Sequence, residues 1–331
     1  MKKILNQLFD QQQLTGQDAY DVLTGIGKAN YNPSQVAAFL TVYLMRQISV
    51  EELKGFRNAL LDLCLKVDLS EFETIDVCGT GGDGKDTFNI STLSAFVVAG
   101  AGYKVAKHGN YGVSSSCGSS NVMEFLGYEF TRDESTLKYQ LETAGFCMMH
   151  APLFHPAMKN VAPVRRELGV KTFFNMLGPL VNPSFPKHQM VGVFNLEVAR
   201  LYNYLFQDIP DFRFNIVHSL DGYDEISLTG KVKSYRPEGE QLLTPDDWGL
   251  ETIEPEAIFG GKTVQQAADI FVAVLNNKGT RAQTEVVLAN AAAAIQVFEP
   301  EKSLPDCVDM ARESILSAKA LASLKKITKI G

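Results

Sequence analysis

The sequence predicts a small N-terminal all-helical domain followed by a large α/β domain with a mostly parallel central sheet. Residues 1–67 form helical patterns throughout, and the character changes at Glu73, where a strand, a glycine-rich loop, a helix and a second strand follow one another. That order is a βαβ unit, whose two strands are parallel and joined by a right-handed crossover. Because 331 residues exceed one average domain, we expect two unequal domains, residues 1–67 and 73–331.

The helical domain is predicted from apolar residues at helical spacing. Residues 32–45 begin with Asn32 as a capping residue and Pro33 at the first helical position, and a broad apolar face follows. Residues 50–65 repeat this pattern. Both apolar faces are broad for a single surface layer, so we expect one of them to pack against a second subunit.

The α/β domain is predicted from alternating strand and helix patterns. The expected strands are residues 74–78, 103–107, 190–194, 214–218 and 226–228. The expected helices are residues 91–101, 121–126, 196–205, 263–275, 284–298 and 307–327.

Charge and cysteine content exclude several classes of protein. There are 31 basic and 38 acidic residues and a net charge of −7, whereas a general nucleic-acid-binding protein has a basic excess. The five cysteines are scattered without a CxxC pair, which favours a reducing compartment over disulfides or a zinc site. Nothing resembles a signal peptide or a membrane span. We therefore expect a cytoplasmic protein that binds neither nucleic acid nor membranes.

The glycine-rich loop that starts at Gly79 fits none of the common short motifs. It matches GxGxxG, but the dinucleotide fingerprint also requires an acid about 20 residues further on, and residues 99–107 contain none. It nearly matches a phosphate-binding P-loop, but Asp86 stands where Ser or Thr must bind magnesium. A turn without a ligand would hardly need this many glycines.

The loop nevertheless has the chemistry of an anion site. Glycines allow backbone N–H groups to approach an anion, and the helix expected near Ser91 adds its positive dipole end and the hydroxyls of Ser91 and Thr92. Lys107 ends the next strand and is followed by a second flexible, serine-rich stretch. Two neighbouring strand ends therefore predict a ligand with more than one phosphate at the carboxyl edge of the sheet.

Six motifs together resemble the anthranilate phosphoribosyltransferase family, the tryptophan-pathway enzymes that join anthranilate to phosphoribosyl pyrophosphate (PRPP). They span nearly the whole chain in the family's order, and the combination is far more specific than GTGGD alone. The motifs are GTGGD (79–83), NIST (89–92), KHGN (107–110), VSSSCGSS (113–120), HPAMKNVAPVRRELGVKTFFNMLGPLVNP (155–183) and DGYDEIS (221–227).

The resemblance implies roles for individual residues. Contacts to PRPP are implied for Gly79, Gly82, Asp83, Thr87, Asn89, Ile90, Ser91, Thr92, Lys107, His108, Gly109, Asn110, Tyr111, Gly112, Val113, Ser114, Ser115 and Ser119. Contacts to anthranilate are implied for Gly79, Asn110 and Arg165, and the ligands of Mg²⁺ are implied to be Ser91, Asp224 and Glu225. Tyr111 and Gly112 depart from the family, in which an Arg and a small residue often follow KHGN.

The family also implies a homodimer formed through the helical domain, a helix near 164–171 that packs with that domain, and a site between the domains. The residues agree with these assignments. Asp224 and Glu225 are hard oxygen ligands of the kind that Mg²⁺ takes together with substrate phosphates. Anthranilate is a planar carboxylate, which the guanidinium fork of Arg165 suits better than a lysine would, and Arg166 is its structural neighbour.

The expected reaction is displacement of pyrophosphate from C1 of the ribose by the amine of anthranilate. Positioning and electrostatic stabilisation of the leaving group would supply most of the catalysis, and His108 is a candidate for accepting the proton. Two alternatives remain open. One is a pyrimidine nucleoside phosphorylase, which has the same architecture but usually an extra C-terminal domain, and the other is a nucleic-acid-binding relative of this fold.

Overall fold

The computed structural model describes residues 1–112 and 117–328. The chain divides into two compact units, one of residues 1–67 and 151–185, the other of residues 68–150 and 186–331. The helical unit therefore takes in the whole segment 151–185, which the sequence analysis assigned to the α/β domain except for one helix near 164–171. Among the described residues, no helix combines the length and the apolar character needed to cross a membrane.

The helical unit begins with four helices, and shorter ones follow in its second segment. The four are α1 (Lys2–Phe9), α2 (Gly16–Gly27), α3 (Pro33–Met45) and α4 (Val50–Leu63). The shorter ones are α8 (Ala151–Phe154), η1 (Pro156–Asn160), α9 (Ala162–Leu168), α10 (Phe174–Leu177) and η2 (Gly178–Leu180).

Aromatic rings from both segments form the core of the helical unit. Phe39 of α3 and Phe56 of α4 are fully buried. The Phe56 ring stacks on Phe173, with ring centroids 4.7 Å apart, and Phe39 meets Phe173 edge to face at 6.1 Å. The segment around Phe173 is thereby part of this core.

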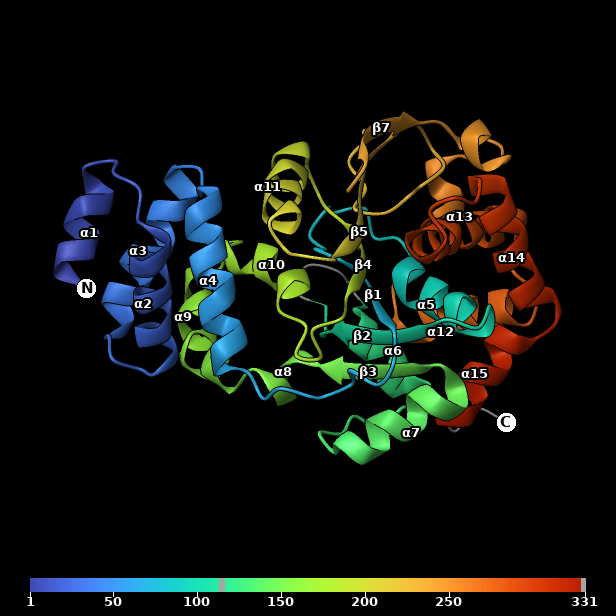
Figure 1. Ribbon diagram of the computed structural model, residues 1–331, viewed down its shortest axis with the longest axis horizontal. Coiled ribbons are helices and arrows are strands. Elements are labelled where there is room, and N and C mark those ends of the chain that lie inside the picture. Colours follow the sequence, from blue (N-terminus) through green and yellow to red (C-terminus); the bar gives the residue numbers. More distant parts are fainter. Residues whose placement is uncertain (113–116, 329–331) are drawn as a thin grey trace. The chain divides into compact units, whose positions relative to one another are not determined.

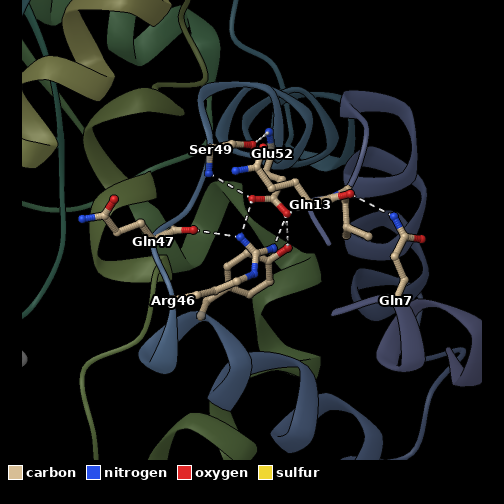
Figure 2. Close-up of polar contacts among 8 residues, drawn as sticks. Gln7, Gln13, Arg46, Gln47, Ser49 and Glu52 are labelled. Carbon is tan, nitrogen blue, oxygen red and sulfur yellow. Dashed lines mark hydrogen bonds and ion pairs between the residues drawn. The ribbon is translucent and has the colours of Figure 1, made fainter. Parts of the chain in front are cut away.

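A buried carboxylate organises the turn between α3 and α4. Glu52 is 0 % exposed, and its carboxylate accepts hydrogen bonds from the backbone N–H groups of Leu14 and Ser49 (both 2.9 Å), the Tyr43 hydroxyl (3.0 Å) and the Arg46 guanidinium. Figure 2 shows Glu52 facing Arg46 and Ser49. Burial alone would raise the pKa of Glu52, but the bonds from Arg46 and the two backbone groups hold it below its ordinary value. Both oxygens of the Glu52 carboxylate are thus hydrogen-bonded, as a buried charge requires.

The second unit contains one seven-stranded sheet with the order β3-β2-β1-β4-β5-β6-β7. The first five strands in this order are parallel, and β5, β6 and β7 pair antiparallel. The strands are β1 (Thr74–Gly79), β2 (Lys104–Gly109), β3 (Phe146–His150), β4 (His188–Gly192), β5 (Arg213–Ser219), β6 (Val232–Arg236) and β7 (Gly239–Leu243). This architecture confirms the predicted fold class.

Helices cover the parallel strands, and Figure 1 shows α11 and α13 on opposite sides of β4 and β5. Most residues of α5 and all residues from Val286 to Val297 of α13 are buried, and the two helices pack against each other. The helices of this unit are α5 (Ile90–Gly100), α6 (Ser119–Phe125), α7 (Glu134–Ala144), α11 (Leu196–Gln207), η3 (Pro245–Trp248), η4 (Pro255–Ile258), α12 (Val264–Leu275), α13 (Arg281–Phe298), α14 (Leu304–Leu316) and α15 (Lys319–Ile327).

Two sequence predictions about the α/β domain are wrong. Residues 226–228, predicted as a strand, form an irregular loop that is bonded to side chains of α13 and β5 and takes no part in the strand pairing of the sheet. Residues 307–327, predicted as one helix, form α14 and α15, because Ala318 between them adopts the left-handed conformation with a φ of 58°. Strand β3 and the hairpin of β6 and β7 were not predicted from the sequence.

Candidate active site

The glycine-rich loop lies at the point where the order of the parallel strands reverses. Strand β1 has β2 on one side and β4 on the other, and the chain leaves β1 at Gly79. In open parallel sheets, ligands bind outside the carboxyl ends of the strands at such a switch point. Gly81 and Gly82 have φ values of 64° and 81°, a conformation that glycine adopts without strain. The loop is tied to β4 by the Thr80 N–H, which donates to the Gly192 carbonyl at 2.9 Å.

The acidic pair lies against this loop. One carboxylate oxygen of Asp224 accepts a hydrogen bond from the Gly81 N–H at 2.6 Å. Glu225 accepts one from the Ser91 N–H, at the start of α5, at 3.0 Å. The Asp224 N–H in turn donates to the Asp83 carboxylate at 3.4 Å. Two segments that are more than 130 residues apart in the sequence are thus joined through three carboxylates.

The two strand ends leave no room for side chains where the acidic pair crosses them. A Cβ atom on Gly79 would lie 2.8 Å from a carboxylate oxygen of Asp224, and one on Gly192 would lie 1.5 Å from the Asp224 carbonyl oxygen. The backbone of the acidic pair therefore passes directly over the end of β4.

Burial and the nearby negative charges raise the pKa of both acids. Asp224 is 7 % exposed, and burial together with the charge of Asp83 raises its pKa to about 8. Burial and the charge of Asp224 hold the pKa of Glu225 well above its ordinary value. The Oε2 atom of Glu225 is buried and has no hydrogen-bond partner among the described residues.

These features fit a divalent cation. A hard cation would compensate the two buried acids, and Glu225 Oε2 is an unused oxygen ligand. No cluster of three metal-binding side chains occurs within residues 1–112 and 117–328. Mg²⁺ does not need one, because it typically takes one or two carboxylates and completes its shell with water and substrate phosphates.

Lys107 is buried close to the acidic pair. It is 2 % exposed, and its ammonium group donates to the Val77 carbonyl in the neighbouring strand. Burial lowers its pKa, while the charges of Asp76, Cys78 and Glu225 act to raise it. The structure therefore places the Lys107 charge inside the unit, near Glu225, and not at the surface of the turn.

His108 is also largely enclosed. Its side chain is 7 % exposed, and its backbone N–H donates to the Asp76 carboxylate at 3.2 Å. Asp76 is fully buried in β1 and so braces the strand that ends in KHGN. This setting favours a positioning role for the His108 backbone over proton transfer by its ring.

The second strand end carries the other predicted PRPP residues. The Ser119 hydroxyl donates to the Asn110 carbonyl at 3.2 Å, and the Gly112 N–H donates to the side chain of Asn121 at 3.0 Å. The Asn89 side chain donates to the Cys117 carbonyl at 3.0 Å and so connects the two loops. The predicted residues Val113, Ser114 and Ser115 lie outside the described residues.

Tyr111, which replaces the residue usual in the family, has its own partners. Its hydroxyl donates to Glu124 at 3.2 Å, and its ring meets the ring of His150 edge to face at 4.7 Å. The side chain is 38 % exposed, so it occupies the outer side of the loop.

In the helical unit, α9 carries Arg165. Its Nη2 donates to the Asn175 side chain at 3.3 Å, and the guanidinium carbon lies 5.3 Å from the centroid of the Phe174 ring. Burial lowers the pKa of Arg165, and no carboxylate pairs with it in the part of the chain that the structure describes. Arg166 is exposed, so of these two adjacent arginines it is Arg165 that has the half-buried, uncompensated charge of an anion-binding arginine.

Several residues of the site were not predicted from the sequence. Gly192, Ser219 and Asp76 contact the acidic pair or the strand ends, and Asn290 binds Ile226, the residue after the pair. One signal was available: Asn290 is the single polar residue in the apolar run LANAAAAI.

Comparison with known proteins assigns the chain to a class. Residues 2–64 match the helical bundle domain of a glycosyl transferase family, and residues 71–321 match its a/b domain. The chain therefore belongs to this glycosyl transferase family, and within it the resemblance to the anthranilate phosphoribosyltransferases holds along the full length.

Two curated relatives are named anthranilate phosphoribosyltransferase. That of Cytophaga hutchinsonii is 58 % identical over 329 residues, which cover 99 % of this chain and 100 % of the relative. That of Flavobacterium psychrophilum is 57 % identical over 330 residues, which cover 100 % and 99 %.

Solved structures give the same result. The chain is similar to anthranilate phosphoribosyltransferase from Thermus thermophilus, with a TM-score of 0.88, 31 % identity and 98 % of each chain covered. It is also similar to the Saccharomyces cerevisiae enzyme in complex with PRPP and Mg, with a TM-score of 0.91, 29 % identity and coverage of 98 % of this chain and 95 % of that one.

Proposed function

We propose that this chain transfers the phosphoribosyl group of PRPP to the amine of anthranilate and releases pyrophosphate. The observation that carries the proposal is the acidic pair Asp224 and Glu225, held against the glycine-rich loop at the switch point of the sheet. Two observations on similar proteins support the proposal. Both curated relatives are named anthranilate phosphoribosyltransferase and match this chain over nearly its full length, and the similar Saccharomyces cerevisiae structure is a complex with PRPP and Mg.

Ser91, Asp224 and Glu225 would hold Mg²⁺, with Glu225 Oε2 as the ligand that has no other partner among the described residues. Bound Mg²⁺ supplies positive charge that stabilises the departing diphosphate. The glycine loop and the N-terminal end of α5 orient that diphosphate and add backbone N–H dipoles. The Gly81 and Ser91 amides already face the two carboxylates, so the loop also fixes where the acids lie.

On the acceptor side, Arg165 would hold the carboxylate of anthranilate and so direct its amine toward C1 of the ribose. The aromatic amine is neutral near pH 7 and needs no strong base before it attacks. Holding the two reactants in line then accounts for much of the rate. Bond formation leaves a proton on the amine nitrogen, and the enclosed ring of His108 is a weaker candidate to accept it than the sequence alone indicated.

A homodimer through the helical unit is part of the proposal. Phe9 of α1 and Leu44 and Met45 of α3 are 58 %, 46 % and 79 % exposed, and α1 and α3 pack together. Large apolar side chains exposed on adjacent helices are typical of a subunit contact. Light scattering of the wild type should give twice the chain mass, and Met45→Glu should shift it toward the monomer. A wild-type monomer at micromolar concentration would rule the dimer out.

The reaction is tested by incubating the protein with PRPP, Mg²⁺ and anthranilate and following the fluorescence of anthranilate. The signal should fall only when all three are present. Asp224→Asn combined with Glu225→Gln should abolish this activity at limiting Mg²⁺. Phosphate-dependent cleavage of thymidine, without loss of anthranilate, would instead identify a pyrimidine nucleoside phosphorylase.

A further inference from the structure

Asn290 of α13 is a buried amide with an unusual set of partners. It is 1 % exposed, and its Oδ1 accepts a hydrogen bond from the Ile226 N–H at 3.1 Å. Its Nδ2 donates to the carbonyls of Ile226 and Val286, both at 2.8 Å. One side chain therefore satisfies both backbone groups of Ile226, the residue directly after the acidic pair.

The Ile226 N–H belongs to the same peptide unit as the Glu225 carbonyl. That carbonyl accepts a hydrogen bond from the Ser219 hydroxyl at 2.6 Å. The peptide is thus held from one edge by Ser219, at the end of β5, and from the other by Asn290. Because a peptide unit is planar, these two bonds fix the direction in which the Glu225 backbone leaves the acidic pair.

Helix α13 is a suitable anchor for this peptide. Every residue from Val286 to Val297 is buried, and the helix packs against α5. The Ser94 hydroxyl of α5 donates to the Val287 carbonyl of α13 at 3.2 Å. Ser94 lies one turn after Ser91, and Val287 lies one turn before Asn290. The two helices are therefore linked at the level where Ser91 and Asn290 bind the acidic segment.

We propose that Asn290 is a positioning residue for the metal-binding acids: through Ile226 it holds Asp224 and Glu225 in register with the amides of Gly81 and Ser91. Its role in the reaction rests on the proposed function, but the positioning itself does not. Only an amide fits, because the position needs an acceptor for one N–H and a donor for two carbonyls. An aspartate of the same shape would place a buried negative charge against both carbonyls.

The first test measures amide hydrogen exchange in the metal-free protein. The variants are Asn290→Asp, which keeps the volume, and Asn290→Ala. The matched control is Gln296→Ala, which removes another buried amide of α13, one that donates to the Lys302 carbonyl at 2.7 Å. In both Asn290 variants, the Gly81 and Ser91 amides should exchange faster, although neither contacts Asn290. The control should leave both amides at the wild-type rate.

The second test measures the Mg²⁺ concentration that gives half-maximal transfer. Loss of a residue that orients a metal ligand typically weakens metal affinity or activity about 10- to 100-fold. We expect a shift of that size for the Asn290 variants, with a much smaller change in the KM for anthranilate, and none for the control. Folded Asn290 variants with wild-type exchange at Gly81 and Ser91 and an unchanged Mg²⁺ requirement would overturn the proposal.

If neither Asn290 variant folds, Ser219→Ala tests the same peptide from its other edge. Faster exchange at Gly81 and Ser91 would support the proposal, and wild-type exchange there would overturn it. A wild type that shows no transfer from PRPP to anthranilate would remove the proposed function, while the exchange measurements would still decide whether Asn290 positions the acids.

Discussion

The carbonyl oxygen of Asp224 lies where the side chain of residue 192 would begin. A Cβ atom on Gly192 would be 1.5 Å from that oxygen and 2.5 Å from the carbonyl carbon. Gly192 ends β4, and its own carbonyl accepts the Thr80 N–H. Glycine at this one position thus allows the acidic segment to cross the end of β4 and reach the loop that follows β1.

Gly192→Ala should therefore disrupt the active site. The new methyl group meets backbone, which cannot rotate away, so either β4 or the acidic segment must move. We expect activity to fall at least about 100-fold and stability to fall by about 1–3 kcal/mol, as for other overpacked positions. Gly230→Ala is the matched control, because a Cβ there would lie 3.8 Å from its nearest neighbour, an ordinary contact. Assays of both variants at saturating Mg²⁺ check this, and normal transfer by Gly192→Ala would contradict it.

Asp224→Asn should stabilise the metal-free protein, and more so in alkaline solution. The pKa of Asp224 is raised to about 8 by burial and by Asp83, so the folded state binds a proton that the unfolded chain releases near pH 4. The stability that this proton contributes is therefore lost progressively as pH rises from about 4 to about 8. The variant should unfold close to the wild-type temperature near pH 4 and at a clearly higher temperature than the wild type at pH 9. Calorimetry with a chelator present checks this, and an equal difference at both pH values would contradict it.

His155 should make the helical unit sensitive to acid. Burial lowers its pKa to about 4, below its ordinary value, so between about pH 6.5 and pH 4 the unfolded chain binds a proton that the folded state does not. Stability is therefore lost as pH falls through this range, by up to roughly 3 kcal/mol.

His155→Gln removes this titration. At pH 8 the variant should be less stable than the wild type, because it repacks a buried site, and the difference should shrink toward pH 4. Denaturant unfolding at a series of pH values measures both. A difference that stays constant down to pH 4 would show that His155 is protonated equally in both states.

The predicted fold class is correct because its main signals are local. The βαβ unit around the glycine loop and the capped helices α3 and α4 are encoded by neighbouring residues. The edge hairpin of β6 and β7 was missed because β7 is exposed and polar. The segment 226–228 has an apolar strand pattern because Ile226 and Leu228 are buried, but its backbone bonds go to the Asn290 and Ser219 side chains and to Ile253.

The candidate site likewise has parts that neighbouring residues encode and parts that depend on distant residues. The glycine-rich loop and the acidic pair are visible as motifs, and the structure places the Asp224 carboxylate against the Gly81 amide and the Glu225 carboxylate against the Ser91 amide. The other residues that hold the acidic pair against the loop are far apart in the sequence. The sequence around each of them can be explained without a functional site, so none of them was predicted. Lys107 illustrates the limit: a lysine near the end of a predicted strand indicates an exposed cation, whereas its ammonium group is buried and donates to the Val77 carbonyl.

Arg165 remains the sharpest test of how the acceptor is bound. Its half-buried guanidinium is held by Asn175 and Phe174 without a compensating carboxylate among the described residues, so it should gain an anionic partner when anthranilate binds. Arg165→Ala should raise the KM for anthranilate by about 10- to 100-fold, which corresponds to the roughly 1.5–3 kcal/mol of a hydrogen bond to a charged group, and it should leave the KM for PRPP nearly unchanged.

Arg165→Lys should recover only part of the loss, because a lysine cannot form the two parallel bonds of the guanidinium. Arg166→Ala, one residue away and exposed, is the control and should behave as the wild type. An equal rise in the KM for both substrates would mean that Arg165 supports the fold of α9 instead of binding the acceptor.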